Sequence, residues 1–243
     1  MFLPGPRSLT VNDRSSALLN ACDEFDFRLT LYRLPECLVE RWDRLYRKLL
    51  VCAQANSSRY TALVMNVDIR LATIEDIPAL RDLIRESVNV LGSRYYTSRQ
   101  IASALNYVFG VDTQLIIDRT YFIAEVEKQI AGSGGWSKRK TLFGGDQAKP
   151  DQTDQLLDPA TEAARIRAFY VRPQWARKGI GSLILHSCEN AARAAGFNRI
   201  ELVATLPGEP LYRARGYKTA EPLQLNTPDG ESLPAFRMEK SFD

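Results

Sequence analysis

The stretch FYVRPQWARKGIGSLIL, residues 169 to 185, joins an apolar strand to an apolar helix through two glycines, Gly179 and Gly181. Two cationic side chains, Arg177 and Lys178, stand directly before the glycines. A strand that ends in such a turn and opens a helix presents several free backbone N–H groups at one point. The helix dipole adds about half a positive charge there, and glycines let an anion approach the main chain. The pattern predicts that a pyrophosphate binds to the amides of residues 177 to 182.

Neither of two common phosphate-binding motifs fits this turn. The Walker pattern, G-x-x-x-x-G-K-[ST], does not occur in the sequence. The dinucleotide pattern, G-x-G-x-x-G, fails because Ile184 stands where the third glycine is required. The alternative is that the two glycines only form a tight turn, but the paired cations and the helix behind them favour an anion site.

The composition is that of an ordinary globular protein, with 45% hydrophobic and 25% charged residues among 243. The net charge of +3 comes from intermixed signs, whereas nucleic-acid binding requires clustered Lys and Arg. We therefore expect no nucleic-acid partner. The sequence has no apolar stretch of membrane-spanning length and no signal-peptide core, so we expect no membrane partner and a cytoplasmic location.

The four cysteines predict neither a metal site nor a disulfide framework. Cys22, Cys37 and Cys52 are 15 residues apart, Cys188 is remote, and His186 is the single histidine. Zinc ligands normally occur in closer pairs, so we expect no metal. Unpaired thiols are typical of a reducing compartment.

Residues 1 to 64 differ from the rest of the chain. Pro4, Gly5 and Pro6 interrupt the start, and a single amphipathic helix is expected where Leu38 and Trp42 recur at helical spacing. Three interpretations stay open: a helical appendage, a poorly ordered leader, or a translated upstream stretch with the true start at Met65. From Met65 to the end we expect one catalytic domain.

The rest of the chain predicts a mixed α/β domain. A strand, turn, helix and strand in succession imply one parallel strand pair inside an otherwise antiparallel sheet. Residues 139 to 162 carry Gly, Pro and Asp without a period and predict a long loop. In chain order we expect a strand at 67–72, helices at 75–88 and around 101–108, a hairpin at 120–137, a strand at 165–171, a helix at 179–195, a strand at 199–204, a short helix at 208–216, and strands at 217–220 and 233–240.

Over residues 67 to 240 the sequence resembles the GNAT-type N-acetyltransferases. VRPQWARKGIGSLIL is similar to the acetyl-CoA-binding motif of that family, [QR]-x-x-G-x-[GA]. A second segment, LPGEPLYRARGYK, resembles the family's A-x-x-(F/L)-Y-x-x-x-G-(F/Y). Two departures occur: Ala176 stands at the first motif position, and Thr205 stands where an asparagine often follows. The resemblance implies a mostly antiparallel sheet with two splayed parallel strands and flanking helices.

The resemblance also implies how acetyl-CoA binds and reacts. The pyrophosphate would sit on the glycine turn, the pantetheine arm would pair with the strand before it, and an amine would attack the acetyl carbonyl in a ternary complex. Tyr212, in the second motif, would protonate the departing thiolate, since a phenol can protonate a thiolate. The residues implied in binding the co-substrate are Phe169, Tyr170, Val171, Arg177, Lys178, Gly179, Ile180, Gly181, Ser182 and Thr205.

The general base and the acceptor site are less defined. Glu125, flanked by apolar residues on a strand, is the first candidate for the base; Glu201 is its rival, and a chain of water molecules is a third option. Tyr95, Tyr96 and Trp136 are candidates for the acceptor pocket, with core or rim packing as the alternative.

The resemblance implies an enzyme that acetylates a primary amine, which we expect to belong to a small molecule. A non-catalytic acetyl-CoA-binding regulatory module, a protein or peptide N-acetyltransferase, and a transferase of longer acyl chains are the alternatives. A homodimer is an open option.

Overall fold

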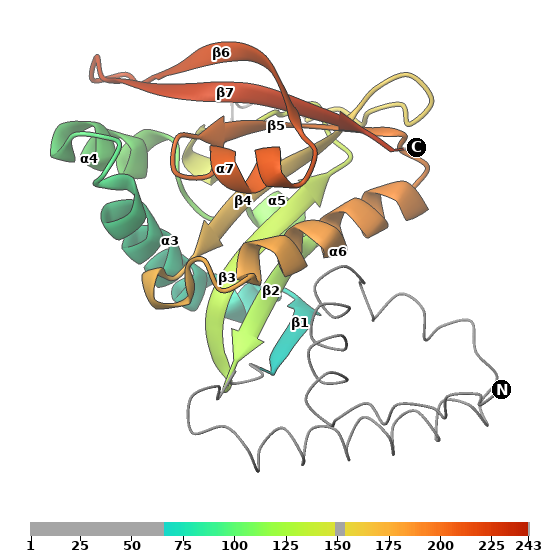
Figure 1. Ribbon diagram of the computed structural model, residues 1–243, viewed down its shortest axis with the longest axis horizontal. Coiled ribbons are helices and arrows are strands. Elements are labelled where there is room, and N and C mark those ends of the chain that lie inside the picture. Colours follow the sequence, from blue (N-terminus) through green and yellow to red (C-terminus); the bar gives the residue numbers. More distant parts are fainter. Residues whose placement is uncertain (1–65, 149–153, 243) are drawn as a thin grey trace, which may run out of the picture. The chain divides into compact units, whose positions relative to one another are not determined.

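The computed structural model describes residues 66–148 and 154–242 (Figure 1). Our interpretations of residues 1–64 concern a part of the chain outside these ranges. In the described residues no helix is both long and apolar enough to span a membrane. Within the described part, the expected order of strands and longer helices is confirmed.

The strands form one seven-stranded sheet in the order β1-β2-β3-β4-β5-β7-β6. Among the described strands, β4 and β5 are the one parallel pair, and every other neighbouring pair is antiparallel. The strands are β1 Val67–Leu71, β2 Tyr121–Val126, β3 Gln129–Ser137, β4 Ala164–Val171, β5 Arg199–Thr205, β6 Lys218–Asn226 and β7 Ser232–Ser241.

Helices cover both faces of this sheet, and α6 runs across one of them in Figure 1. The cluster under α6 also includes α7, and this side is called the α6 face below. The opposite side, packed by α3, α4 and α5, is called the α3 face. The helices are η2 Ile74–Asp76, α3 Ile77–Gly92, α4 Ser98–Tyr107, α5 Thr113–Ile117, η3 Asp146–Ala148, η4 Pro173–Trp175, α6 Ile180–Ala194 and α7 Glu209–Ala214.

Helix α6 shows why these segments fold as the sequence predicts. Ile180, Ile184, Leu185 and Cys188 recur at three- and four-residue intervals and are buried against the sheet. Full burial of an aliphatic side chain of this size contributes about 1.5–3 kcal/mol. The helix is followed by Gly196, whose φ of 90° lies in the left-handed region that favours glycine.

Two features differ from the sequence-based expectation. Helix α5, Thr113–Ile117, was not predicted because five residues are too short to show a helical period. Strand β6 runs nine residues, to Asn226, although most of its side chains are exposed. Strand β6 is longer than the expected strand at 217–220 because it pairs along its length with β7, and β7 is partly buried.

Candidate functional site

The parallel strands β4 and β5 separate after three residue pairs. Their pairing ends at Ile166 and Leu202, although β4 continues to Val171 and β5 to Thr205. The separated segments, 167–171 and 203–205, are called the gap below. On its other edge β4 still pairs with β3, so within the described residues the backbone of 169–171 has no strand partner on the side of the gap and can pair with an extended ligand.

A β-bulge starts this separation. Arg167 pairs with Gly135 and Tyr170 with Ser133, so β4 uses one more residue than β3 over this span. Ala168, within the bulge, has a φ of 53°, which is uncommon for a residue with a side chain. The bulge bends β4 away from β5 at the residues implied in binding the pantetheine arm.

The glycine turn lies between the end of β4 and the start of α6. Arg177 has a φ of 62° and Gly179 a φ of 87°, and the helix begins at Ile180. Within the described residues, no backbone amide from 177 to 182 donates a hydrogen bond to a backbone carbonyl. Arg177 and Lys178 are exposed, and the Lys178 ammonium lies 4.9 Å from the centroid of the Trp175 ring. The turn therefore presents N–H groups without a backbone partner among the described residues, together with two cations.

Glycine is favoured at positions 179 and 181 for two different structural reasons. A Cβ at Gly179 would meet no atom within 4 Å, so the space in front of the turn is open. A Cβ at Gly181 would lie 3.0 Å from Cδ2 of Leu211 in α7. Gly179 keeps the turn accessible, whereas Gly181 allows α7 to pack on α6. This role of Gly181 was not predicted from the sequence.

Helix α7 places Tyr212 beside the gap. The Tyr212 ring packs edge-on against Phe169 of β4, with centroids 6.0 Å apart, and against Tyr217 at 5.7 Å. The side chain is buried, yet no hydrogen bond links its hydroxyl to the described residues, and that oxygen is not among the fully occluded polar atoms. Burial raises the pKa of the Tyr212 phenol above its ordinary value, so the hydroxyl keeps its proton at neutral pH.

Thr205 lies on the same side of the gap as Tyr212. A Cβ at Gly208 would contact both residues, at 3.4 Å from Thr205 Oγ1 and 3.5 Å from Tyr212 Cε2. The structure therefore brings together Phe169 on one edge of the gap, Thr205 on the other, and Tyr212 beside them.

Glu125 does not join this group. It lies on β2, two strands from β4, which corresponds to about 10 Å at ordinary strand spacing. Its carboxylate accepts hydrogen bonds from Arg70 at 2.7 and 3.0 Å, and Arg70 also pairs with Asp76 before α3. This ion-paired cluster is on the α3 face, whereas Tyr212 belongs to the α6 face. The placement argues against Glu125 as a base acting at the gap.

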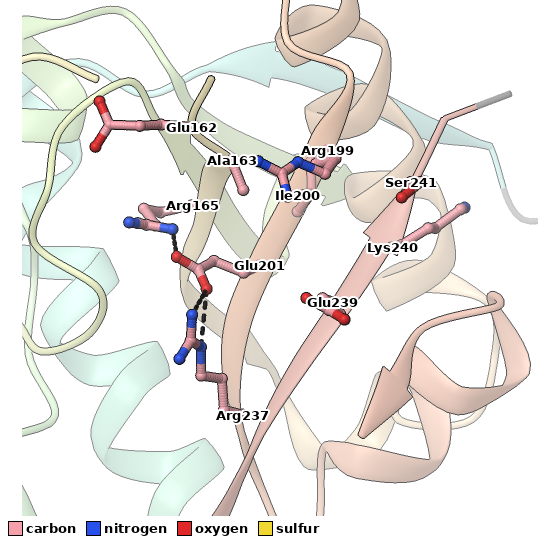
Figure 2. A pocket seen from close by; sticks show the side chains of 10 residues that line it. All are labelled: Glu162, Ala163, Arg165, Arg199, Ile200, Glu201, Arg237, Glu239, Lys240 and Ser241. Carbon is pink, nitrogen blue, oxygen red and sulfur yellow. Dashed lines mark hydrogen bonds and ion pairs between the residues drawn. The ribbon is translucent and has the colours of Figure 1, made fainter. Parts of the chain in front are cut away.

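Glu201, the rival base, is held between two arginines (Figure 2). One carboxylate oxygen accepts from Arg237 at 2.6 and 2.9 Å, and the other pairs with Arg165. The three side chains line a pocket of about 310 Å³. Glu201 stands opposite Arg165, where β4 and β5 are still paired, so it lies at the other end of these strands from the glycine turn. Its oxygens are occupied by guanidinium groups and do not reach the gap.

The three aromatic candidates for the acceptor pocket have different environments. Tyr95 is 49% exposed, on the loop between α3 and α4. The buried Tyr96 donates a hydrogen bond to the Pro234 carbonyl and accepts one from the Leu206 amide, both at 2.9 Å. Leu206 follows Thr205, so Tyr96 holds the end of β5 beside the gap. Trp136 is different: it is buried on the α6 face, edge-on to Phe197, where β3 pairs with the start of β4. The structure places Trp136 in the core and not at an acceptor entrance.

One further cation, which was not predicted from the sequence, lies at the turn. Arg215 Nε donates to Ser182 Oγ at 3.2 Å, and the Arg215 side chain is exposed. It belongs to the second motif, in RARGYK, and that membership is the signal that could have identified it.

The family model of the GNAT acetyltransferases matches residues 89–217, which is more than half of the chain. This chain belongs to the GNAT acetyltransferase family. The matched range contains both motifs, the gap and Tyr212. Members of this family use acetyl-CoA as their co-substrate.

Solved structures support the same fold. PaiA N-acetyltransferase from Thermoplasma acidophilum, in complex with coenzyme A, is 17% identical; the match covers 73% of this chain and 100% of that one, with a TM-score of 0.51. A GCN5-related N-acetyltransferase from Rhodopseudomonas palustris is 19% identical over 75% of this chain and 100% of its own, with a TM-score of 0.55. No curated protein sequence matches significantly. At these identities the structures establish the fold alone.

Proposed function

We propose that this GNAT acetyltransferase transfers the acetyl group of acetyl-CoA to the primary amine of a small molecule, by direct attack in a ternary complex. The observation that carries the proposal is the position of Tyr212. Its protonated hydroxyl, which has no hydrogen-bond partner among the described residues, lies beside a gap between β4 and β5. Strand β4 leads from that gap into a turn whose amides have no backbone partner in the same part of the chain. A site that only bound the co-substrate would need the turn and the gap but no proton donor.

The residues of the turn fit the pyrophosphate of the co-substrate. The free amides of residues 177–182 donate hydrogen bonds to phosphate oxygens, and Arg177, Lys178 and Arg215 supply opposite charge. The open space in front of Gly179 admits the phosphates.

Strand β4 holds the pantetheine arm. The backbone of Phe169–Val171 faces the gap and pairs with the amide groups of the arm, in the way that a strand pairs with its neighbour. Thr205 offers a hydroxyl from the opposite edge. The thioester supplies the electrophilic acetyl carbonyl.

Proton transfers at the gap complete the reaction. The acceptor ammonium loses a proton to water, because both candidate carboxylates, Glu125 and Glu201, are held by arginines away from the gap. The neutral amine forms a bond to the carbonyl carbon, and its nitrogen then gives up a second proton to water. The C–S bond breaks, and Tyr212 gives its phenolic proton to the departing thiolate. Solvent then reprotonates Tyr212.

Replacing Tyr212 with Phe tests the proposal, because it removes the hydroxyl and keeps the ring packing against Phe169 and Tyr217. We expect kcat to fall on the order of 100-fold or more, as for the loss of a general acid, with an unchanged dissociation constant for CoA. The measurements are release of CoA in a screen of amines and isothermal titration with CoA. An unchanged kcat would refute the role of Tyr212.

The same screen separates the alternatives. Tight binding of acetyl-CoA without turnover of any amine or peptide would identify a binding module. Tighter binding of longer acyl thioesters than of acetyl-CoA would identify another acyltransferase.

A further inference from the structure

Beneath the bulge of β4 lies a buried ion pair between Arg167 and Asp112. Their side chains are 1% and 0% exposed, and Arg167 Nη2 lies 2.6 Å from Asp112 Oδ2. The same guanidinium donates a hydrogen bond to the Gly144 carbonyl at 2.9 Å and lies 3.9 Å from the Asp154 carboxylate. Arg167 therefore connects β4 to the segment before α5 and to the loop of residues 139–162.

Stability alone does not account for this pair. Removing two charges from water costs free energy that their attraction often fails to recover, and a buried pair can commonly be replaced by uncharged side chains without loss of stability. Arg167 occupies an almost fully buried position, where an apolar residue would pack without that cost.

The place of Arg167 in the strand indicates another role. The residue pairs of β4 with β5 end one residue earlier, at Ile166, and the bulge residue Ala168 comes one residue later. Continued in register, β4 would next pair Arg167 with Val203 and close the gap. The side chain of Arg167 instead draws this point of β4 toward Asp112 and Gly144.

A second contact acts on the bulge from the same face. The hydroxyl of Tyr121, a fully buried residue of β2, donates to the Ala168 carbonyl at 3.3 Å and lies 3.1 Å from Ser133 Oγ. Tyr121 thus contacts the bulge residue itself, and Arg167 holds the residue before it. The two contacts over-determine a conformation that the sequence, with alanine at a positive φ, would not adopt unaided.

We propose that the Arg167–Asp112 pair is a positioning element that keeps β4 apart from β5 and so holds Phe169–Val171 ready for the pantetheine arm. This inference rests on the proposed function, because it assigns the gap to the co-substrate. The pair makes no contact with the reacting atoms. Loosening it allows the two strands to close, so that the co-substrate must reopen them when it binds.

The test replaces both charges at once, with Arg167→Met and Asp112→Asn in one protein, so that neither charge is left buried alone. Asparagine keeps one oxygen acceptor at position 112 and replaces the other oxygen with an N–H donor. We expect the dissociation constant for CoA, measured by isothermal titration, to rise on the order of 10-fold or more, as misplacement of a binding group does. In the CoA-free protein we expect slower hydrogen exchange at the gap-facing amides of residues 168–171 and 203–205.

A matched control comes from a second ion pair, which involves the same loop of residues 139–162 that Arg167 contacts. Arg139 Nε lies 2.6 Å from Asp118 Oδ2, with side chains 23% and 7% exposed, and neither residue belongs to β4. Arg139→Met with Asp118→Asn should lower the melting temperature and leave the CoA affinity as in the wild type. An equal loss of affinity in this control would show that any loosening of the loop suffices and would refute the proposal.

The remaining outcomes are also decisive. If the wild type binds CoA and the double variant at 167 and 112 binds it equally well, the pair is only structural. If the wild type itself fails to bind CoA, the proposed function fails instead. Should the double variant not fold, Arg167→Lys is the second test. Lysine keeps the charge but replaces the planar guanidinium, whose Nη2 contacts Asp112 and Gly144 and whose Nη1 lies toward Asp154, with a single ammonium on a flexible stem. Weaker CoA binding by this variant supports the proposal, and unchanged binding overturns it.

Discussion

Tyr212 acts in the proposed reaction only while its hydroxyl carries a proton. Burial raises the pKa of this phenol above the ordinary value of about 10, so deprotonation begins at a higher pH than in a free tyrosine. For a group that serves as an acid, a raised pKa extends the active range to alkaline pH. We therefore expect kcat, at saturating substrates, to show no alkaline decrease below about pH 10. A decrease with a midpoint near pH 8 in the wild type, absent from Tyr212→Phe, would mean that the Tyr212 pKa is lowered and not raised.

Substitutions at Gly179 and Gly181 should separate an effect on co-substrate binding from an effect on helix packing. Gly179→Ala places a methyl group in the open space before the turn and strains a φ of 87°, which costs about 1–2 kcal/mol for a residue with a Cβ. The strain is present in the free and the bound protein alike and lowers stability, whereas the methyl group displaces the phosphates from the amides. For that reason we expect CoA to bind about 10-fold more weakly, which corresponds to about 1.4 kcal/mol of binding free energy. Isothermal titration measures the effect.

Gly181→Ala should act differently, because its methyl group would contact Leu211 and not the co-substrate. Overpacking of this kind costs about 1–3 kcal/mol, and it displaces the helix that carries Tyr212. We expect a lower melting temperature and a lower kcat, with a smaller change in CoA affinity than Gly179→Ala produces. The reverse ranking of the two affinities would contradict the division of roles between these glycines.

The end of β5 depends on a side chain from the loop between α3 and α4. Tyr96→Phe removes the hydroxyl that bonds the Leu206 amide and the Pro234 carbonyl, and an unsatisfied buried polar group costs about 1–3 kcal/mol. We expect a lower melting temperature and a lower kcat/KM for acetyl-CoA, because Leu206 continues directly from the edge of the gap. Tyr95→Phe, at an exposed neighbour, is the control for stability and should leave the melting temperature unchanged. A loss of stability without any change in kcat/KM would limit Tyr96 to a structural role.

Elements with a clear period or turn were predictable from the sequence, and pairings between distant residues were not. Helix α6 and the glycine turn follow from local signals, namely apolar spacing, two glycines and two cations. The role of Gly181 depends on Leu211, 30 positions along the chain, and therefore appears only when α7 packs on α6.

The same reasoning explains why Glu125 and Trp136 lie away from the gap and why Arg167 was not predicted. Glu125 has the apolar neighbours of a buried carboxylate, but its pairing with Arg70 depends on the register between β1 and β2. Trp136 stands on a strand with two buried faces, where the alternation of side chains does not reveal which face is the site. Arg167 carries no local signal at all, because its partner Asp112 lies in another element.

At the scale of the whole molecule, the two faces of the sheet have different roles at the gap. One face carries the residues proposed to bind and react with the co-substrate, and the other carries the residues that position the strands. On the α6 face, α6 begins at the glycine turn and α7 supplies Tyr212. On the α3 face, Tyr96 and Arg167 hold β5 and β4 in the positions that keep them apart. Every residue assigned to the co-substrate lies between Phe169 and Arg215, and the side chains that hold the gap belong to the same sheet and its helices.

Because that machinery lies within residues 66–242, a chain shortened to residues 65–243 should bind acetyl-CoA as the full chain does. A ligand that binds only the folded state stabilises it by about 2.7 kcal/mol at 100 times its dissociation constant. We therefore expect acetyl-CoA to raise the melting temperature of both chains by the same amount at equal ligand concentration, measured by thermal unfolding. The Gly179→Ala variant of each chain serves as control and should show a smaller rise. A shortened chain that folds, yet gains no stability from acetyl-CoA, would show that residues 1–64 contribute to the site.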